Sequence, residues 1–363
     1  MPINTRIPNS DYNDSTVKIL SLFSGCGGMD LGFEGGFSFL GKEYPRHNVE
    51  IKFANDILIP ATKCYEYNFH KSVETKSITD LTDEDLPETD IDLVLGSCPC
   101  QPFSYAGKRK GLSDPRGTLY QDLIRIIEKY KPKMFVSENV DGIRNSKKDR
   151  HGEAVDKSAL DTMMQSFEKA GYHSIYKVVN SADYGVPQTR RRVIIIGIRD
   201  DLGEVKDITY PEPTHAESIE GLKKWVSAKE AIDDLFDKVG KTAIPNHTVR
   251  DISKAKFYPG KKMQGNNQIS ADRPGPTIRA EHHGNIEAHY RSLDGEIGNP
   301  DMNTWRRLSV RECARIQSFP DTYDFPVSAS SAYKVIGNAV PPVLAWHIAE
   351  SVLNTLNELK EHQ

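Results

Sequence analysis

The sequence predicts an α/β protein with a doubly wound, mainly parallel sheet and a smaller, loop-rich, β-leaning domain. Short apolar runs rich in strand-forming residues alternate with helix-like segments through the first half of the chain. This alternation is typical of parallel strands joined by crossover helices. After about residue 200 the chain changes to Pro-, Gly- and His-containing segments with weak periodicity. Helical periodicity returns at 332–356, and this buried final helix is expected to pack back on the first domain.

Six strands and two crossover helices are expected in the first domain. The strands are expected at 17–23, 51–55, 91–97, 133–139, 172–180 and 191–198. The helices are expected at 119–130 and 158–170, where apolar residues recur at helical spacing.

Length and composition exclude several classes of protein. A chain of 363 residues corresponds to two or three domains, or to one large domain with an insertion. With 37% hydrophobic and 27% charged residues, fibrous and disordered proteins are excluded. No run approaches the roughly 20 apolar residues of a membrane span, and no secretory signal is apparent, so we expect a cytoplasmic protein with no membrane partner. Five cysteines are too few, and odd in number, for a disulfide framework.

The charge distribution says more than the net charge of -4. A negative total does not indicate a nucleic-acid partner, because such proteins carry a positive surface. However, the region 80–92 is acidic and lacks Lys and Arg, so it can mask basic runs elsewhere. The basic runs lie at 108–110, 144–150, 190–192 and 305–315. Each run is a candidate for phosphate contacts or, alternatively, a solvated face.

A glycine-rich turn follows the first expected strand. Residues 23–28 read Phe-Ser-Gly-Cys-Gly-Gly, and glycines at a strand-to-helix turn let the backbone approach a nucleotide-like ligand. Asp56 follows the second of the expected strands, where a carboxylate can bind ribose hydroxyls. The glycine spacing does not fit G-x-G-x-x-G and Asp56 lies too far along the chain, so a nicotinamide enzyme is disfavoured. A plain tight turn would give the same pattern.

Two cysteines mark the end of the next strand. Cys98 and Cys100 leave it at the same edge of the sheet, where a thiolate would be a strong nucleophile. We expect one of them to be in the core and the other, nearer the open end, to be chemically active. Without a second Cys/His pair at a suitable spacing, no zinc or other metal site is predicted.

A glutamate and two arginines follow on neighbouring strands. Glu138 ends the next strand at the same edge, so it can share a pocket with Cys100 and relay a proton. A helix-capping or salt-bridged glutamate is the alternative interpretation. Arg190 and Arg192 precede a very apolar strand on one side of the chain, and there they require anionic or carbonyl partners.

At this point the sequence resembles a known family, the cytosine-5 DNA methyltransferases of the bacterial and phage modification type, which use S-adenosylmethionine. The resemblance covers 17–199 and continues from 306 to the last helix, and the ordered set of motifs is highly specific. The motifs are FSGCGG (23–28), PCQPFS (99–104), ENV (138–140), QTRRR (188–192), RRLSVRECARIQSFP (306–320) and GNAVPP (337–342).

The resemblance implies roles for the catalytic residues. Cys100 resembles the nucleophile that adds to cytosine C6, and Glu138 the group that protonates or hydrogen-bonds N3. Arg192 resembles the residue that holds the cytosine O2, and Arg190 the arginine at the nucleophile and the DNA backbone. The fold implied is a Rossmann-like methyltransferase sheet with a target-recognition domain.

The resemblance also implies a cofactor site for S-adenosylmethionine, which becomes S-adenosylhomocysteine. Two positions depart from the family: Asp56 where a Glu is frequent, and Ser77 where an Asp often contacts the adenine. A serine can still hydrogen-bond there. The matching positions are Phe23, Gly25, Cys26, Gly27, Gly28, Asp56, Ile57, Ser77, Ile78, Pro99, Leu119 and Asn338.

Double-stranded DNA is the implied partner. A mobile loop is expected to close over the DNA, and side chains in 277–287 can meet base edges in the major groove, although the two histidines there are equally well surface or structural residues. The implied DNA-binding residues are Gln101, Ser104, Lys108, Thr277, Arg279, His282, His283 and Asn285. The enzyme is expected to act as a monomer, with a possible cognate restriction endonuclease.

Three segments and two rival interpretations complete the prediction. We expect a catalytic, cofactor-binding domain at 15–200, a target-recognition domain at 201–327 and a C-terminal segment at 328–363. A transfer-RNA cytosine methyltransferase is disfavoured because its usual Cys-Phe-Thr signature is absent. A catalytically dead DNA-binding relative is disfavoured because Cys100 and Glu138 are both present.

Overall fold

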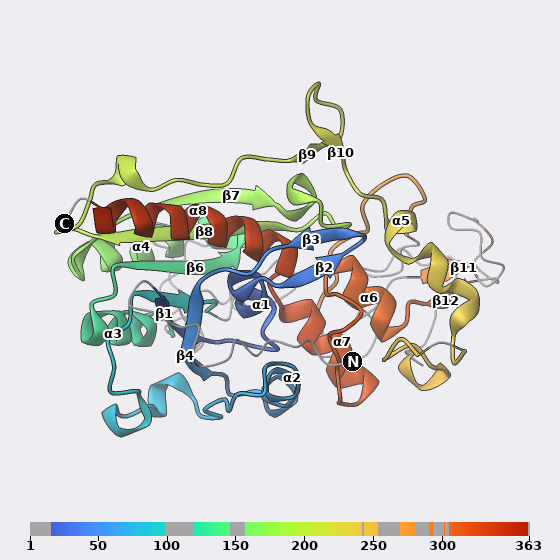
Figure 1. Ribbon diagram of the computed structural model, residues 1–363, viewed down its shortest axis with the longest axis horizontal. Coiled ribbons are helices and arrows are strands. Elements are labelled where there is room, and N and C mark those ends of the chain that lie inside the picture. Colours follow the sequence, from blue (N-terminus) through green and yellow to red (C-terminus); the bar gives the residue numbers. More distant parts are fainter. Residues whose placement is uncertain are drawn as a thin grey trace.

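A six-stranded sheet forms the centre of the computed structural model (Figure 1). The structure describes residues 16–98, 119–145, 157–241, 243–252, 269–280, 290–292, 301 and 305–361. The strand order is β4-β1-β5-β6-β8-β7. The strands are β1 (Val17–Leu22), β4 (Val49–Asn55), β5 (Leu93–Gly96), β6 (Met134–Val140), β7 (Tyr172–Asn180) and β8 (Arg191–Arg199).

The sheet confirms the predicted fold class. β4, β1, β5 and β6 pair in parallel, while β8 runs antiparallel to both of its neighbours, β6 and β7. All six strands lie where the apolar runs predict them, within a few residues at each end. Alternate residues of each strand face opposite sides of the sheet, which gives the sheet two buried faces.

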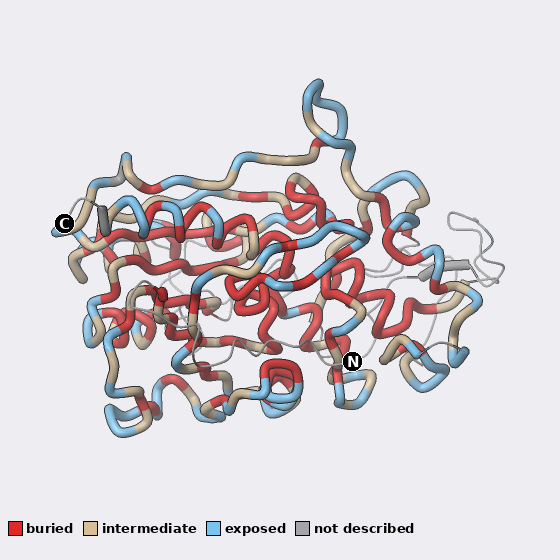
Figure 2. The backbone as a smooth tube through the Cα atoms, in the orientation of Figure 1, coloured by how far each residue is buried: buried red, intermediate tan, exposed pale blue. Residues whose placement is uncertain are grey.

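Helices cover both faces. α1 (Gly28–Glu34) and α8 (Pro342–Glu361) contribute to the larger hydrophobic cluster, and α3 (Tyr120–Tyr130) and α4 (Ala159–Lys169) to the smaller one. Figure 2 shows the buried residues concentrated on the strands and on these helices. The amphipathic pattern of 119–130 and 158–170 therefore predicted the two crossover helices correctly.

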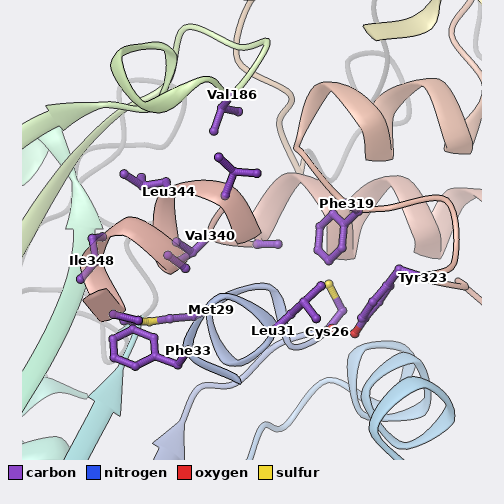
Figure 3. Packing of buried hydrophobic residues seen from close by; sticks show 14 of the residues in the cluster. Cys26, Met29, Leu31, Phe33, Val186, Phe319, Tyr323, Val340, Leu344 and Ile348 are labelled. Atoms are coloured by element: carbon purple, nitrogen blue, oxygen red, sulfur yellow. Dashed lines mark hydrogen bonds between the residues drawn. The ribbon is translucent and has the colours of Figure 1, made fainter. Parts of the chain in front are cut away.

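The last helix packs directly on the first. Met29 and Phe33 of α1 contact the cluster that contains Leu344 and Ile348 of α8 (Figure 3). A Cβ atom on Gly32 would lie 2.3 Å from the Cβ of Ala345, so only glycine permits this approach. The expected return of the C-terminal helix to the first domain is present.

The remaining elements are short. The hairpin of β2 (Phe37–Phe39) and β3 (Lys42–Tyr44) was not predicted; it follows two glycines with positive φ, Gly35 and Gly36. In the described part of 201–327 the strands are two or three residues long, as expected for a loop-rich region. The other elements are α2 (Ile59–Phe69), β9 (His215–Ala216), β10 (Lys223–Lys224), α5 (Ala228–Ile232), β11 (Tyr290–Ser292), β12 (Trp305–Arg307), α6 (Val310–Ile316) and α7 (Ala329–Asn338). Among the described residues, no helix has the length and apolar character needed to cross a membrane.

Candidate active site

The glycine-rich turn forms the wall of a pocket at the carboxyl edge of the sheet. Gly25 has a φ of 58°, and a Cβ atom there would meet open space. Gly27, with a φ of 81°, is the N-cap of α1, a left-handed conformation that glycine adopts at no steric cost. The pocket is small, with a cavity volume of about 30 Å³. Its lining residues are Ser21, Leu22, Phe23, Ser24, Gly25, Gly28, Met29, Leu95, Ser97, Asn338, Ala339 and Val340.

Four of the predicted cofactor residues therefore line one pocket. Phe23, Gly25 and Gly28 come from the turn, while Asn338 comes from the end of α7, more than 300 residues later in the chain. A side chain on Gly28 would collide with the carbonyl oxygen of Val340, at 2.3 Å from its Cβ. The structure thus brings the FSGCGG and GNAVPP motifs together.

Asp56 lies beside the turn. Its Oδ2 accepts a hydrogen bond from the Gly25 N–H at 2.9 Å, and its Oδ1 accepts one from the Leu58 N–H at 2.7 Å. Burial raises the pKa of the Asp56 carboxyl, and these two backbone hydrogen bonds oppose that shift. The carboxylate therefore connects the pocket wall to the start of α2.

Other predicted cofactor residues lie around or beneath the pocket. The Cys26 thiol is buried and donates to the Val335 carbonyl at 3.5 Å, and burial raises the pKa of this thiol well above its usual range. Gly27 lies under the Phe69 ring, where a Cβ atom would come within 2.3 Å of the ring. In the structure, then, Cys26 and Gly27 contact the core, and their contact with a cofactor stays a prediction.

The adenine-side residues are less closely grouped. Ile57 is exposed and Ile78 is buried, and the Ser77 hydroxyl is 2.7 Å from that of Thr79. Leu119, at the N-cap of α3, packs against the smaller cluster, as does Phe23. Their contact with a cofactor also stays a prediction.

Glu138 and Arg192 form an ion pair at the same edge of the sheet. The Nε of Arg192 lies 2.8 Å from the Oε1 of Glu138, and the two side chains are only 12% and 8% exposed. The antiparallel pairing of β6 with β8, in which Val140 faces Arg192, brings the two residues together. Arg192 thus has the anionic partner that its position required.

Arg190 has different partners. Its guanidinium is 2% exposed and donates to the carbonyl oxygens of Ile278 at 3.1 Å, Gly337 at 3.0 Å and Ala339 at 3.1 Å. The expected carbonyl partners are therefore present, but they belong to two segments far away in the sequence. Nothing in the residue pattern indicates which segments these are.

The nucleophile itself lies outside the described residues. Cys98 is buried in the smaller cluster, in agreement with the expectation that one of the two cysteines is a core residue. Six further predicted residues besides Cys100 and Pro99 also lie outside the described part of the chain. These are Gln101, Ser104, Lys108, His282, His283 and Asn285, of which the first three follow Cys100 directly.

Thr277 and Arg279 belong to a segment that runs beside the QTRRR motif. The Thr277 hydroxyl donates to the Thr189 carbonyl at 2.7 Å, and Gly275 forms a parallel β-bridge with Gln188. Two buried glutamines at this junction, Gln188 and Gln317, received no role from the sequence. Both lie inside family motifs, QTRRR and RRLSVRECARIQSFP, and this position was the one sequence signal that could have pointed to them.

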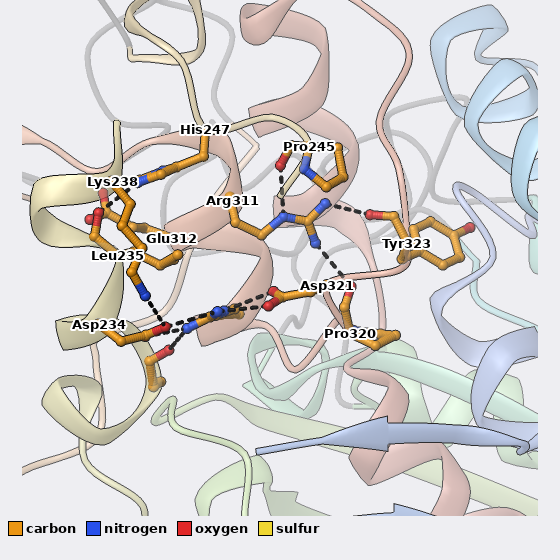
Figure 4. Close-up of polar contacts among 12 residues, drawn as sticks. Asp234, Leu235, Lys238, Pro245, His247, Arg311, Glu312, Pro320, Asp321 and Tyr323 are labelled. Carbon is orange, nitrogen blue, oxygen red and sulfur yellow. Dashed lines mark hydrogen bonds and ion pairs between the residues drawn. The ribbon is translucent and has the colours of Figure 1, made fainter. Parts of the chain in front are cut away.

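The prediction that the basic run at 305–315 contacts phosphates is wrong for Arg311 and Arg315, because both arginines bind groups inside the protein. Arg311 is fully buried and donates to the carbonyls of Pro245, Pro320 and Tyr323 (Figure 4). Burial lowers the pKa of Arg311 to about 10. Arg315 binds the carboxylates of Asp234 and Asp321. Because these donors already have internal partners, they hold the loops around α6 together.

A mostly parallel sheet with a glycine-walled pocket beside a buried carboxylate–arginine pair is the architecture of an enzyme that binds a nucleotide-like cofactor. Comparison with known proteins is more specific. Residues 17–354 match the family model for C-5 cytosine-specific DNA methylase.

The chain is also similar to individual proteins. It is 35% identical to the type II methyltransferase M.FnuDI of Fusobacterium nucleatum, over 94% of this chain and 96% of the relative. It is 36% identical to the type II methyltransferase M.NgoPII of Neisseria gonorrhoeae, with the same coverage of both chains. The fold matches the crystal structure of the S. pombe Dnmt2 methyltransferase with a TM-score of 0.64 at 18% identity, over 95% and 99% of the two chains. This chain therefore belongs to the C-5 cytosine-specific DNA methylase family and is a DNA (cytosine-5-)-methyltransferase.

Proposed function

We propose that this enzyme transfers a methyl group from S-adenosylmethionine to C5 of a flipped-out cytosine within a specific short duplex DNA site. The reaction passes through a covalent bond between Cys100 and cytosine C6. The observation that carries this proposal is the buried Glu138–Arg192 ion pair, at the same sheet edge as the glycine-walled pocket. That edge is where successive parallel strands present their catalytic groups.

The glycine-walled pocket is the proposed place of the cofactor. Phe23, Gly25, Gly28 and Asn338 would form its walls, and the Asp56 carboxylate beside Gly25 would bind the ribose hydroxyls. Since a Cβ atom on Gly25 would meet open space, the backbone there can come close to a ligand. When bound, S-adenosylmethionine supplies an electrophilic methyl group on its sulfonium.

The protein must make cytosine C5 nucleophilic, because C5 reacts poorly by itself. The Cys100 thiolate adds to C6 while Glu138 protonates or hydrogen-bonds N3, so that C5 gains the electron density of an enamine. After C5 has been methylated, loss of the C5 proton and then of the thiolate restores the aromatic ring. Arg192 holds Glu138 in place and binds the cytosine O2, while Arg190 acts at the nucleophile and the DNA backbone through the segments that its guanidinium holds.

The target base must leave the duplex to reach these groups. Flipping costs a few kcal/mol, which contacts to the DNA must supply. In the proposal, Gln101, Ser104 and Lys108 fill the space that the base leaves. The residues of the recognition domain that read the site are Thr277, Arg279, His282, His283 and Asn285.

The biological setting follows from the relatives. M.FnuDI and M.NgoPII are type II methyltransferases, which supports a restriction–modification role with a cognate endonuclease. We propose that the enzyme acts as a cytoplasmic monomer. Its catalytic domain would span 15–200, its recognition domain 201–327 and its returning C-terminal segment 328–363.

Bisulfite sequencing tests the reaction. Plasmid DNA incubated with the protein and S-adenosylmethionine should contain 5-methylcytosine at one short sequence. Structured RNA treated in parallel should stay unmodified. Methylation of the RNA alone would show that the transfer-RNA interpretation is right.

A trapping experiment tests the role of Cys100. A duplex with 5-fluorocytosine at the target should become covalently attached through Cys100, because fluorine at C5 cannot leave as a proton does. Cys100→Ser should abolish both trapping and methyl transfer while S-adenosylhomocysteine still binds. An adduct at Cys98, or full turnover by the variant, would refute the mechanism.

A further inference from the structure

Two distant segments meet behind the glycine-walled pocket. The first is the recognition segment, residues 275–280, which contains Thr277 and Arg279, two of the proposed base-reading residues. The second is the helix break, residues 336–340, where α7 ends before α8 begins. A Cβ atom on Gly337 would lie 2.4 Å from the carbonyl carbon of Arg279 and 2.5 Å from the nitrogen of Ala280. The two backbones are therefore in direct contact.

A chain of hydrogen bonds joins the same two segments. The Ile278 N–H donates to the Oε1 of Gln188 at 2.9 Å, and the Nε2 of Gln188 donates to the Oε1 of Gln317. The Nε2 of Gln317 then donates to the carbonyls of Ala339 at 2.6 Å and Ile336 at 3.1 Å. We call Gln188 and Gln317 the glutamine relay.

The relay is buried, and both of its amides donate their hydrogen bonds toward the helix break. Both glutamines have 0% exposure, so water cannot replace a lost partner. Each amide oxygen accepts and each amide nitrogen donates, and the Nε2 of Gln188 also donates to the Ile316 carbonyl at 3.2 Å. Breaking one link would leave a buried polar group without a partner, at a cost of roughly 1–3 kcal/mol. A displacement of either segment is therefore opposed through the relay.

Arg190 connects the same two segments in parallel. Its Nη1 donates to the Ile278 carbonyl, and its Nη2 donates to those of Gly337 and Ala339. Both backbone polar groups of Ile278 are thus bound to side chains, Arg190 directly and Gln188 through Gln317, that lead to the helix break. Ala339, like Asn338 and Val340, lines the pocket.

From this geometry we infer that the glutamine relay couples occupation of the cofactor pocket to the position of the recognition segment. Gln188 and Gln317 are positioning residues: they are buried and do not line the pocket, but they fix the wall of one site against the backbone of the other. This inference rests on the proposed function, because it assigns the pocket to S-adenosylmethionine and the side chains of Thr277 and Arg279 to DNA. It adds that the two ligands should assist each other's binding.

The test measures that assistance directly. The probes are S-adenosylhomocysteine and a duplex oligonucleotide with the site that bisulfite sequencing identifies. DNA affinity is measured by fluorescence anisotropy with and without S-adenosylhomocysteine. The affinity for S-adenosylhomocysteine is measured by calorimetry with and without DNA. The two ratios must be equal, since coupling is reciprocal.

Three variants are compared with the full-length wild type: Gln188→Leu, Gln317→Leu and the double variant. The double variant removes both amides of the relay, whereas Gln317→Leu keeps the bond from the Ile278 N–H to Gln188. Asn68→Leu is the matched control. Asn68 is also buried, and it bonds to the carbonyls of Cys64 and Asp324 but to neither segment. Thermal unfolding of all four variants measures the purely structural cost.

In the wild type, S-adenosylhomocysteine should tighten DNA binding. In the relay variants this coupling factor should fall by roughly two- to thirtyfold, and Asn68→Leu should keep the wild-type value at comparable loss of stability. Equal coupling in the wild type and the double variant would overturn the inference, as would a wild type without coupling. If the wild type binds no S-adenosylhomocysteine or methylates no cytosine, the proposed function itself fails, and this is visible before any variant is made.

Discussion

Asp30, in the first turn of α1, should make the enzyme's stability depend on pH in an unusual direction. Its carboxyl is fully buried and accepts a hydrogen bond at 2.7 Å from the hydroxyl of Ser21, a residue of the pocket wall. Burial raises the pKa of Asp30 from 3.8 to about 7. The carboxyl therefore stays largely neutral in the folded protein up to neutral pH.

The sign follows from proton linkage. Below pH 3.8 Asp30 is protonated in both the folded and the unfolded chain, so it adds no pH dependence. Between about pH 4 and pH 7 only the unfolded chain loses the proton, so rising pH favours unfolding. Over the interval between the two pKa values, the free energy of unfolding falls by at most about 4 kcal/mol. Above pH 7 both states are ionised and the contribution becomes constant.

Asp30→Asn isolates this contribution, because asparagine does not ionise and can still accept the Ser21 hydroxyl. Urea denaturation of both proteins from pH 4 to pH 8 should show the variant gaining stability relative to the wild type as pH rises, by as much as about 4 kcal/mol at pH 7. A constant difference across this range would refute the reasoning.

Asp85→Asn provides a control of opposite sign. A hydrogen bond from Lys76, and to a smaller extent one from Thr82, lowers the pKa of Asp85 from 3.8 to about 2. Its stabilising contribution is present above pH 3.8 and is lost as pH falls toward 2. The Asp85→Asn variant should therefore be less stable than the wild type at neutral pH, with the difference vanishing in acid.

Two further predictions concern packing and DNA binding. Gly32→Ala should destabilise the protein by roughly 1–3 kcal/mol, because the new methyl group would collide with Ala345 of α8; an unchanged denaturation midpoint would contradict the close packing of α1 on α8. Arg191 is 57% exposed on its side chain, directly before Arg192 at the catalytic edge, and its Nε lies 3.2 Å from Asp141. Arg191→Ala should reduce the salt dependence of duplex binding by about one phosphate contact. Arg199→Ala, at the other end of β8, should leave the salt dependence unchanged. If the binding constants of Arg191→Ala and wild type depend equally on salt concentration, this contact is excluded.

The sequence predicted the sheet because its signal is local. Each strand is an apolar run bounded by polar or glycine residues, and the turn at 23–28 follows the first strand directly. The sheet edge then groups the ends of β1 and β6 by topology alone. For this reason the pocket wall and the position of Glu138 could be expected in advance.

The partners of the buried arginines could not be predicted. Arg192 binds Glu138 only because β8 runs antiparallel beside β6, while Arg190 takes carbonyls from Ile278 and from the helix break. Arg311 belongs to a basic run that resembles an exposed face, yet carbonyls from three loop residues bind it in the interior. Backbone carbonyls have no sequence signature, so neither charge nor periodicity reveals such partners.

The pocket wall combines two segments that the ribosome makes far apart in time. Residues 23–28 are translated long before residues 338–340, yet the cavity needs both, and α1 needs α8 to cover it. Contacts between such widely separated parts of a chain are slow to form. A nascent chain that has not yet emerged through residue 340 therefore lacks part of this pocket wall.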